Sequence, residues 1–219
     1  MTGFSSNFTE SAEKDVCRVQ NIGALRGSRT LVNRATNTLR LDWLELAGRD
    51  APTSLVLSDS MMLGEAKFIG VDIEKSVIDS LRAQQRPHCE FYHGAFDKLV
   101  RNERHLFSRV GVLNLDTTYG WQGDRRPPIV EECAVASEFI ISRLTPGRLG
   151  EIPTREFLFI VNGYVRKSSE VIPTIDRALA PLRAACKTLR IPIRVANAIT
   201  YPSRGRTSEM INLALAIGY

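Results

Sequence analysis

Hydrophobic and polar residues follow two different periods along this chain, and the change from one to the other predicts the order of helices and strands. Short apolar runs between turn residues are typical of strands buried on both faces of a parallel sheet, whereas apolar residues every three to four positions are typical of amphipathic helices. The run VGVLNL at 110–115 is a clear example of the first kind. By these criteria the sequence predicts strands at 54–58, 67–73, 89–94, 110–115, 155–164, 191–201 and 210–219, and helices at 74–85, 97–107, 129–144 and 171–189.

The first fifth of the chain has a different pattern. Residues 1–20 are polar and aperiodic, which predicts a mobile or loosely docked arm. From Ser28 to Ala47 apolar residues recur at helical spacing, and Gly48 stands where a helix would end. We therefore expect an N-terminal arm over 1–27 and one domain over 28–219 that begins with a helix, since 219 residues suffice for one well-packed domain.

Strands that alternate with helices predict an α/β fold of three layers around a mainly parallel, seven-stranded sheet. Only the segment SRGRTSE, without room for a helix, separates the strand at 191–201 from the strand at 210–219. A parallel crossover needs a dozen or more residues. The last two strands are therefore expected to form an antiparallel hairpin.

Composition narrows the class of protein further. No stretch approaches about 18 consecutive apolar residues, and the N-terminus lacks a basic segment followed by an apolar one, so we expect no membrane span and no secretion signal. The cysteines are far apart, without a CxxC pair or a histidine at ligand spacing, which predicts reduced thiols in a cytoplasmic protein and no metal site. The net charge of +5 permits contact with nucleic acid without requiring it.

Five strand-helix units closed by an antiparallel pair resemble the Rossmann-like fold of class I S-adenosylmethionine-dependent methyltransferases, over roughly 28–219. The segment 68-FIGVDIEKSVIDSLRAQ-84 is the best local match, because an acid at the tip of the second strand can accept hydrogen bonds from two ribose hydroxyls. The resemblance implies S-adenosylmethionine as the cofactor, with Asp72 and Ile73 beside its nucleoside. Asp72 can instead cap the helix that follows it, where acids are favoured in any protein.

The other cofactor contacts that the resemblance implies depart from the family pattern. The first strand should lead into a glycine-rich turn at a helix N-terminus. With that strand at 54–58, the turn falls on SDSMMLGEA, which has one glycine and places Ser58, Asp59 and Gly64 at the amino-acid end of the cofactor. After the third strand, Ala95 and Phe96 stand near the adenine, although Phe96 can equally be a core residue. The glycine-poor turn indicates a pocket that is reshaped or lost.

The tetrad 116-DTTY-119 follows the strand predicted at 110–115. Family members that methylate adenine or similar nitrogens carry at this point an acid or Asn, two prolines and an aromatic residue. The resemblance implies that Asp116 and a backbone carbonyl at Thr117 accept hydrogen bonds from an exocyclic amine while Tyr119 stacks on the base. Threonine in place of proline loses the rigid turn, and an ordinary strand-to-loop transition explains the same residues.

These observations predict a methyltransferase that acts on a nitrogen, with adenine in nucleic acid as the candidate acceptor. Four arginines in two predicted loops are candidate phosphate contacts: Arg125, Arg126, Arg204 and Arg206. The alternative is a non-catalytic methyltransferase-like protein that binds nucleic acid or a protein partner. The glycine-poor turn favours this alternative, whereas Asp72 and the DTTY tetrad favour catalysis.

Overall fold

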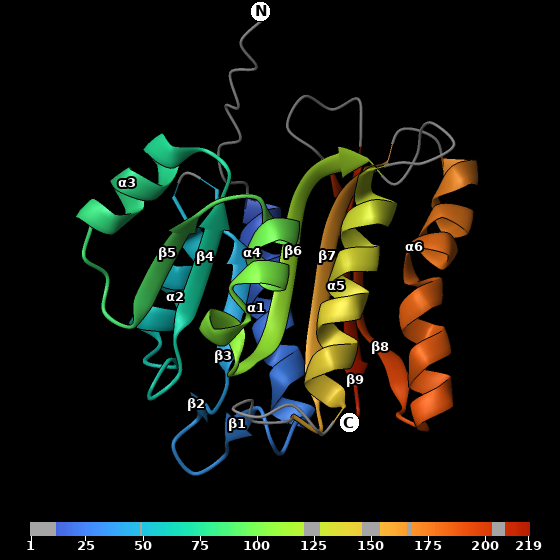
Figure 1. Cartoon of the computed structure of the whole chain (residues 1–219), viewed down its shortest axis with the longest axis horizontal. Coiled ribbons are helices and arrows are strands. Elements are labelled where there is room, and N and C mark those ends of the chain that lie inside the picture. Colours follow the sequence, from blue (N-terminus) through green and yellow to red (C-terminus); the bar gives the residue numbers. More distant parts are fainter. Residues whose placement is uncertain (1–11, 49, 121–127, 146–153, 166–167, 203–208) are drawn as a thin grey trace, which may run out of the picture.

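The structure is a computed structural model that describes residues 12–48, 50–120, 128–145, 154–165, 168–202 and 209–219. A seven-stranded sheet with the order β5-β4-β3-β6-β7-β9-β8 forms its middle layer (Figure 1). Five neighbouring strands are parallel, and β9 is antiparallel to β7 and β8. The sheet strands are β3 (Asp42–Leu46), β4 (Phe68–Asp72), β5 (Cys89–His93), β6 (Val110–Gly120), β7 (Phe157–Val165), β8 (Ile193–Pro202) and β9 (Glu209–Ile217). The predicted fold class and the C-terminal hairpin are confirmed.

Helices cover both faces of the sheet. One face packs against α4 (Phe96–Asn102), α5 (Pro128–Leu144) and α6 (Ser168–Leu189), which lie in front of the sheet in Figure 1. The other face packs against α1 (Ala12–Ala24), α2 (Pro52–Asp59) and α3 (Lys75–Ala83). Two short 3₁₀ helices, η1 (Leu25–Gly27) and η2 (Arg104–Phe107), complete the described helices. Each face of the central strands therefore buries its own hydrophobic core.

The helix predicted between Ser28 and Ala47 is wrong. These residues form a small hairpin, β1 (Val32–Asn33) and β2 (Thr38–Leu39), followed by β3 in the centre of the sheet. Trp43 and Leu44 are only 1% and 0% exposed, because the two faces of β3 enter different cores. A strand buried on both faces lacks the period of two, and the hairpin turn spaces the remaining apolar residues as a helix would.

The strand predicted at 54–58 is also wrong, because these residues belong to α2. Pro52 at the start of the helix presets the backbone angle φ for the first turn. Leu57 is fully buried and Leu55 is exposed, as expected for a helix that lays one side on the sheet. The first strand of the sheet is therefore β3, and the turn after β3 includes Ala47, Gly48 and Ala51.

The N-terminal segment is more ordered than the sequence predicted. Residues 12–24 form α1, which packs against β8 and β9. Cys17 and Asn21 are buried on its inner side, whereas Val16 and Val19 are exposed on its outer side. The apolar positions of α1 are too few and too scattered to reveal the helix, since its buried side is largely polar.

Strand β6 extends past the predicted end at Leu115. It continues to Gly120, which pairs with Tyr164 of β7 after an irregularity in register beyond Asp116. Threonine and tyrosine favour extended backbone, so the DTTY tetrad prolongs the strand instead of starting a loop. Within the described ranges no helix is long and apolar enough to cross a lipid bilayer.

Gly111 permits the close approach of the N-terminal hairpin to β6. A Cβ added at Gly111 would lie 2.8 Å from Cβ of Leu41 and 2.7 Å from Cδ2 of Leu31. We predict that Gly111→Ala lowers the free energy of unfolding by about 1–3 kcal/mol, because overpacking displaces the hairpin. Gly23→Ala in α1 is the matched control: a Cβ there meets no atom within 4 Å, and alanine favours the helix. Urea unfolding measures both, and equal stability of the two variants would contradict the close contact.

Candidate functional site

The carboxyl ends of β4, β3 and β6 meet at one edge of the sheet, which we call the carboxyl edge. The chain turns from β3 toward β4 and β5 on one side and toward β6 and β7 on the other, and open α/β sheets bind ligands at such a switch point. Leu46 pairs with Val71, and Glu45 pairs with Asn114, so Asp72 and Asp116 lie at the same level on either side of β3. The structure thus brings these two predicted site residues to one edge.

The turn after β3 supplies the exposed backbone at this edge. Gly48 has φ of +58° and is exposed, and a Cβ added there would meet no atom within 4 Å. Ala51 has φ of +38° and stands directly before α2. The sequence prediction missed this turn because it placed 28–47 in a helix. The signals present were Gly48 and, four residues later, a proline suited to the start of a helix.

Three predicted cofactor residues lie at the opposite end of the sheet, which we call the amino edge. Ser58 and Asp59 form the last turn of α2, which runs from the carboxyl edge to the amino edge. A Cβ on Gly64 would lie 2.8 Å from Cβ of Thr38 in the N-terminal hairpin. The structure therefore does not bring these residues together with Asp72. They were predicted at the cofactor because the first strand was placed at 54–58, which is in fact α2.

Asp72 stands at the end of β4 and stabilises the local turn that leads into α3. Its Oδ1 accepts a hydrogen bond of 2.7 Å from the backbone N–H of Glu74, directly before α3. Ile73, which follows, is 70% exposed although it is a large apolar residue. His93 at the end of β5 contacts the carbonyl oxygen of Ile73 at 3.0 Å through Nε2. The bond to Glu74 uses one carboxylate oxygen of Asp72, so the other oxygen is available for a ribose hydroxyl.

Ala95 and Phe96 stand at the start of α4. Ala95 is the residue before the first turn of that helix, with extended backbone. Phe96 is 8% exposed and packs in the core formed with α5 and the front of the sheet. The core alternative for Phe96 is thus the one that the structure displays.

Asp116 makes an ion pair that the sequence did not indicate. Lys14 of α1 places Nζ 2.6 Å from Oδ2 of Asp116, and both side chains are mostly buried. Beside this pair lies a cavity of about 10 Å³, room for roughly one water molecule. Its walls are polar: Lys14, Cys17, Arg18, Asn21, Thr53, Asn114, Asp116, Asn162 and Asn212. Helix α1 therefore covers the end of β6 on the face that Asp116 occupies.

The remaining predicted residues are only partly described. Thr117 and Tyr119 lie in the extension of β6, but their side chains are outside the described part of the chain. The loops with Arg125, Arg126, Arg204 and Arg206 also lie outside the described residues. Among the described residues, no three His, Cys, Asp or Glu side chains gather as a metal site would require.

A row of buried side chains crosses the sheet beneath the carboxyl edge. We call it the amide chain, and it consists of Glu45 (β3), Asn114 (β6), Asn162 (β7) and Asn212 (β9). Asn114 donates to Glu45 at 2.9 Å, Asn162 to Asn114 at 3.3 Å, and Asn212 to Asn162 at 2.5 Å. All four residues are 5% exposed or less. Each amide has a donor and an acceptor, so the bonds continue from strand to strand.

Glu45 is the acidic end of the amide chain. Trp43 Nε1 donates to it at 2.8 Å and the Thr53 hydroxyl at 2.9 Å, in addition to Asn114. Burial raises the pKa of Glu45 to about 7, because desolvation of the carboxylate outweighs these hydrogen bonds. The nearby negative charge of Asp116 acts in the same direction. Thr53 belongs to the first turn of α2, so this bond also fixes where the turn after β3 ends.

Comparison with known proteins identifies the fold. No protein-family profile and no curated protein matches the sequence. Among solved structures, Trm5b from Pyrococcus abyssi superposes with a TM-score of 0.53 at 10% identity over 96% of this chain. The precorrin-6y C5,15-methyltransferase of Geobacter metallireducens gives 0.51 at 8% identity over 98% of this chain and 91% of its own.

A third similar structure contains a ligand. Fibrillarin from Aeropyrum pernix, with natively bound S-adenosyl-L-methionine, has a TM-score of 0.52 at 15% identity over 90% of this chain and 75% of its own. The present chain spans 51% of the length of the Trm5b chain. Identities this low show the fold alone, and the fold is that of the Rossmann-like class I methyltransferases.

The raised pKa of Glu45 gives a pH-dependent stability. Between about pH 4.5 and 7 the native state keeps a proton that the unfolded chain has lost, so the free energy of unfolding falls as the pH rises. We predict that Glu45→Gln removes about 3 kcal/mol of this fall, at about 1.4 kcal/mol per pKa unit. Its amide oxygen can accept from Trp43 and Asn114, and its NH₂ group can donate to the Thr53 hydroxyl.

Urea unfolding at pH 5, 6, 7 and 8 checks this prediction. The pKa of Glu132 is also raised to about 7 by burial, but Glu132 is common to both proteins, so their difference isolates Glu45. The control Glu138→Gln changes an exposed carboxylate and should follow the parent profile. Parallel profiles for Glu45→Gln and the parent would show that Glu45 titrates normally.

Proposed function

We propose that this protein transfers a methyl group from S-adenosylmethionine to a nitrogen of a nucleic-acid base. The observation that carries the proposal is the juxtaposition of Asp72, exposed Ile73 and the turn after β3 at the switch point of the sheet. A nucleoside needs an acceptor for its ribose hydroxyls and an apolar surface for its base. Asp72 and Ile73 offer these on adjacent residues.

The chemistry of the residues at the carboxyl edge fits the cofactor in part. The second carboxylate oxygen of Asp72 can accept from a ribose hydroxyl while Oδ1 keeps the bond to Glu74. Open space around Gly48 leaves room for a ligand against the backbone of the turn. Pro52 removes one N–H group from the start of α2, so that end of the pocket offers fewer donors than a glycine-rich turn.

The acceptor nitrogen is proposed to lie at Asp116. When bound, S-adenosylmethionine would supply a sulfonium with a transferable methyl group, and the electrons of its broken C–S bond would stay on sulfur as the nitrogen lone pair bonds the methyl carbon. Asp116 orients an exocyclic amine and receives the proton that the nitrogen loses. Lys14 occupies Oδ2 of Asp116 in the structure, so an acceptor that uses this oxygen displaces the Lys14 side chain.

The second candidate is a non-catalytic binding protein with a methyltransferase fold. The ion pair between Lys14 and Asp116 favours it, because α1 fills the place of an acceptor and leaves a cavity of about 10 Å³. The single glycine of the turn after β3 favours it as well. Binding of the cofactor and transfer of the methyl group are therefore tested separately.

We predict that the protein binds S-adenosylmethionine in calorimetric titration and that Asp72→Asn weakens binding by roughly 10- to 100-fold. The reason is the loss of charge-assisted hydrogen bonds to the ribose, each contributing about 1.5–3 kcal/mol. Asparagine keeps an oxygen for the N–H of Glu74, so the start of α3 is retained. Asp79→Asn, an exposed site in α3 paired with Lys75, changes the charge equally and should leave the affinity unchanged. Absence of heat with the parent protein would favour the binding protein.

We predict that Asp116→Asn lowers methyl transfer by about 100-fold or more, the usual contribution of a positioned proton acceptor. The assay measures tritium passed from methyl-labelled S-adenosylmethionine to bulk RNA and bulk DNA. Lys14→Met is the matched control, because it breaks the same ion pair and leaves the carboxylate of Asp116 in place. This variant should retain transfer or exceed the parent. Equal activity of both variants would remove Asp116 from the mechanism, and cofactor binding without any transfer would favour the non-catalytic protein.

A further inference from the structure

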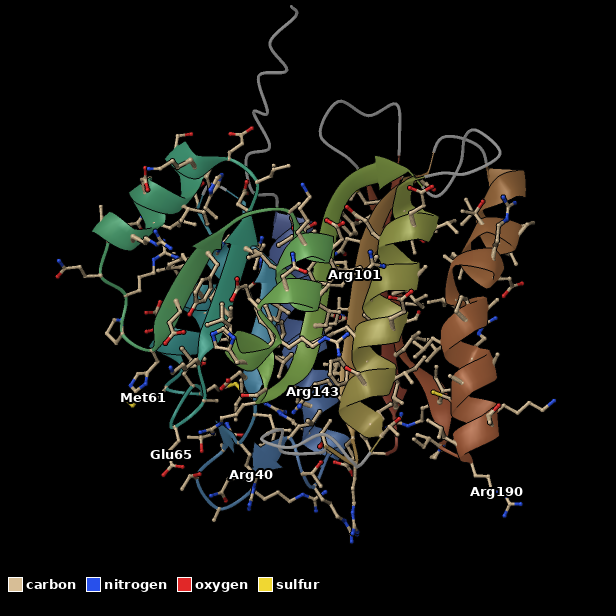
Figure 2. All side chains as sticks on the ribbon, viewed as in Figure 1. Arg40, Met61, Glu65, Arg101, Arg143 and Arg190 are labelled. Carbon is tan, nitrogen blue, oxygen red and sulfur yellow. The ribbon has the colours of Figure 1, made fainter. Side chains whose placement is uncertain are left out.

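The amino edge of the sheet carries a band of arginines on the side of the molecule opposite the candidate site. The segment 24–41 contains four arginines, Arg26, Arg29, Arg34 and Arg40, and no acidic residue or lysine. All four side chains are exposed. Figure 2 shows Arg40 at the lower end of the molecule beside the β1-β2 hairpin, far from the carboxyl ends of the strands.

Three further arginines adjoin this segment from other parts of the chain. Arg109 directly precedes β6, and its guanidinium donates to the carbonyl oxygen of Arg40 at 3.2 Å. Arg155 precedes β7 by two residues and is exposed. Arg194 of β8 lies 3.4 Å from the place that a Cβ on Gly27 would occupy. Arg109 and Arg194 thus contact the segment 24–41, and Arg155 precedes Glu156, which accepts from the backbone N–H of Arg29. We call these seven residues the arginine band.

Two carboxylates within the arginine band, those of Glu156 and Asp42, are buried and do not cover it, whereas the exposed Glu65 lies near Arg40 (Figure 2). Glu156 is 8% exposed and accepts from the backbone N–H groups of Arg29 and Thr30 and from the hydroxyls of Ser28 and Thr30. These bonds hold its pKa below the ordinary range. Asp42 is 4% exposed and accepts from the N–H of Lys67. The two buried carboxylates hold the backbone in place, and six of the seven arginines are exposed. Arg109 is partly buried, and Arg194 Nε donates to the carbonyl oxygen of Tyr219 at 2.9 Å.

The geometry points to a docking surface for the phosphate backbone of a nucleic-acid duplex on the arginine band. The segment 24–41 contains arginine without lysine, and the planar guanidinium pairs with phosphate through two parallel N–H bonds. The β1-β2 hairpin adds exposed polar groups at Thr36 and Asn37, typical of contacts to phosphate and sugar. Attachment to an anionic membrane would call for exposed large apolar side chains beside the basic ones, whereas the leucines of the segment 24–41 are buried.

This surface is independent of the proposed methyl transfer. Asp72 and Asp116 lie at the carboxyl edge, so phosphates on the arginine band belong to a part of the nucleic acid other than a reacting base. Binding there needs neither the cofactor nor Asp116. A failure of methyl transfer and a failure of duplex binding are therefore separate results.

The test is fluorescence anisotropy with labelled 30-base-pair RNA and DNA duplexes of arbitrary sequence, titrated with the full chain between 50 and 300 mM salt. The measured quantity is the slope of the logarithm of the association constant against the logarithm of the salt concentration. In the variant R26Q/R29Q/R34Q/R40Q we expect the magnitude of this slope to decrease by about 3 to 4 for DNA, at about 0.9 per phosphate contact. The hairpin variant R34Q/R40Q should lose about half as much. The side chains of these four arginines are exposed, so thermal unfolding of the variants should match the parent.

The control removes the same charge from other surfaces: K75Q, K98Q, R101Q and R183Q combined. These four side chains are exposed on α3, α4 and α6, and their ion pairs are of the surface kind that contributes little to stability. The control variant should keep the salt slope of the parent. Three results would overturn the proposal: no duplex binding by the parent, an equal loss in the control, or binding to vesicles of anionic phospholipid without binding to either duplex.

Discussion

The buried carboxylate of Glu45 is the constraint on which the arrangement at the carboxyl edge depends. A carboxylate leaves water at a large cost in free energy unless hydrogen bonds replace its solvation. Trp43, Thr53 and Asn114 supply these bonds from β3, α2 and β6. Since the three donors belong to three elements, the bonds hold the start of α2 against two strands. The turn between β3 and α2, the expected approach for a ligand, is thereby fixed at both of its ends.

The amide chain extends this constraint across the sheet. Each asparagine points to the same face, and a slip of one residue in any strand would turn its amide to the other face and leave a buried polar group without a partner. The amide chain and the hydrophobic packing thus both specify the register of β6, β7 and β9. Its last oxygen, Oδ1 of Asn212, has no hydrogen-bond partner among the described atoms and lines the small cavity beneath α1.

The sequence predicted an element correctly where the apolar and polar residues of that element alone show the pattern typical of a helix or a strand. Strands β4 and β5 and the C-terminal hairpin were predicted because an apolar run and its flanking turns lie within one short segment. Strand β3 was not predicted. It is buried on both faces, so its residues do not alternate between apolar and polar, and the apolar residues of the preceding hairpin happen to recur at helical spacing. The amide chain had a signal, because Asn114, Asn162 and Asn212 each interrupt an apolar run: VLNLD, IVNGY and MINLA. The pairing of Lys14 with Asp116 had none, since it joins distant segments through tertiary packing.

Helix α1 connects the two edges of the sheet. Its first turns carry Lys14 to Asp116 at the carboxyl edge, and its end leads through η1 into Ser28–Thr30, where Glu156 holds the chain at the amino edge. The helix has 13 residues and thus spans about 20 Å. Because Lys14 reaches Asp116 through a flexible four-carbon side chain, the ion pair can open while the bonds to Glu156 keep the end of α1 in place.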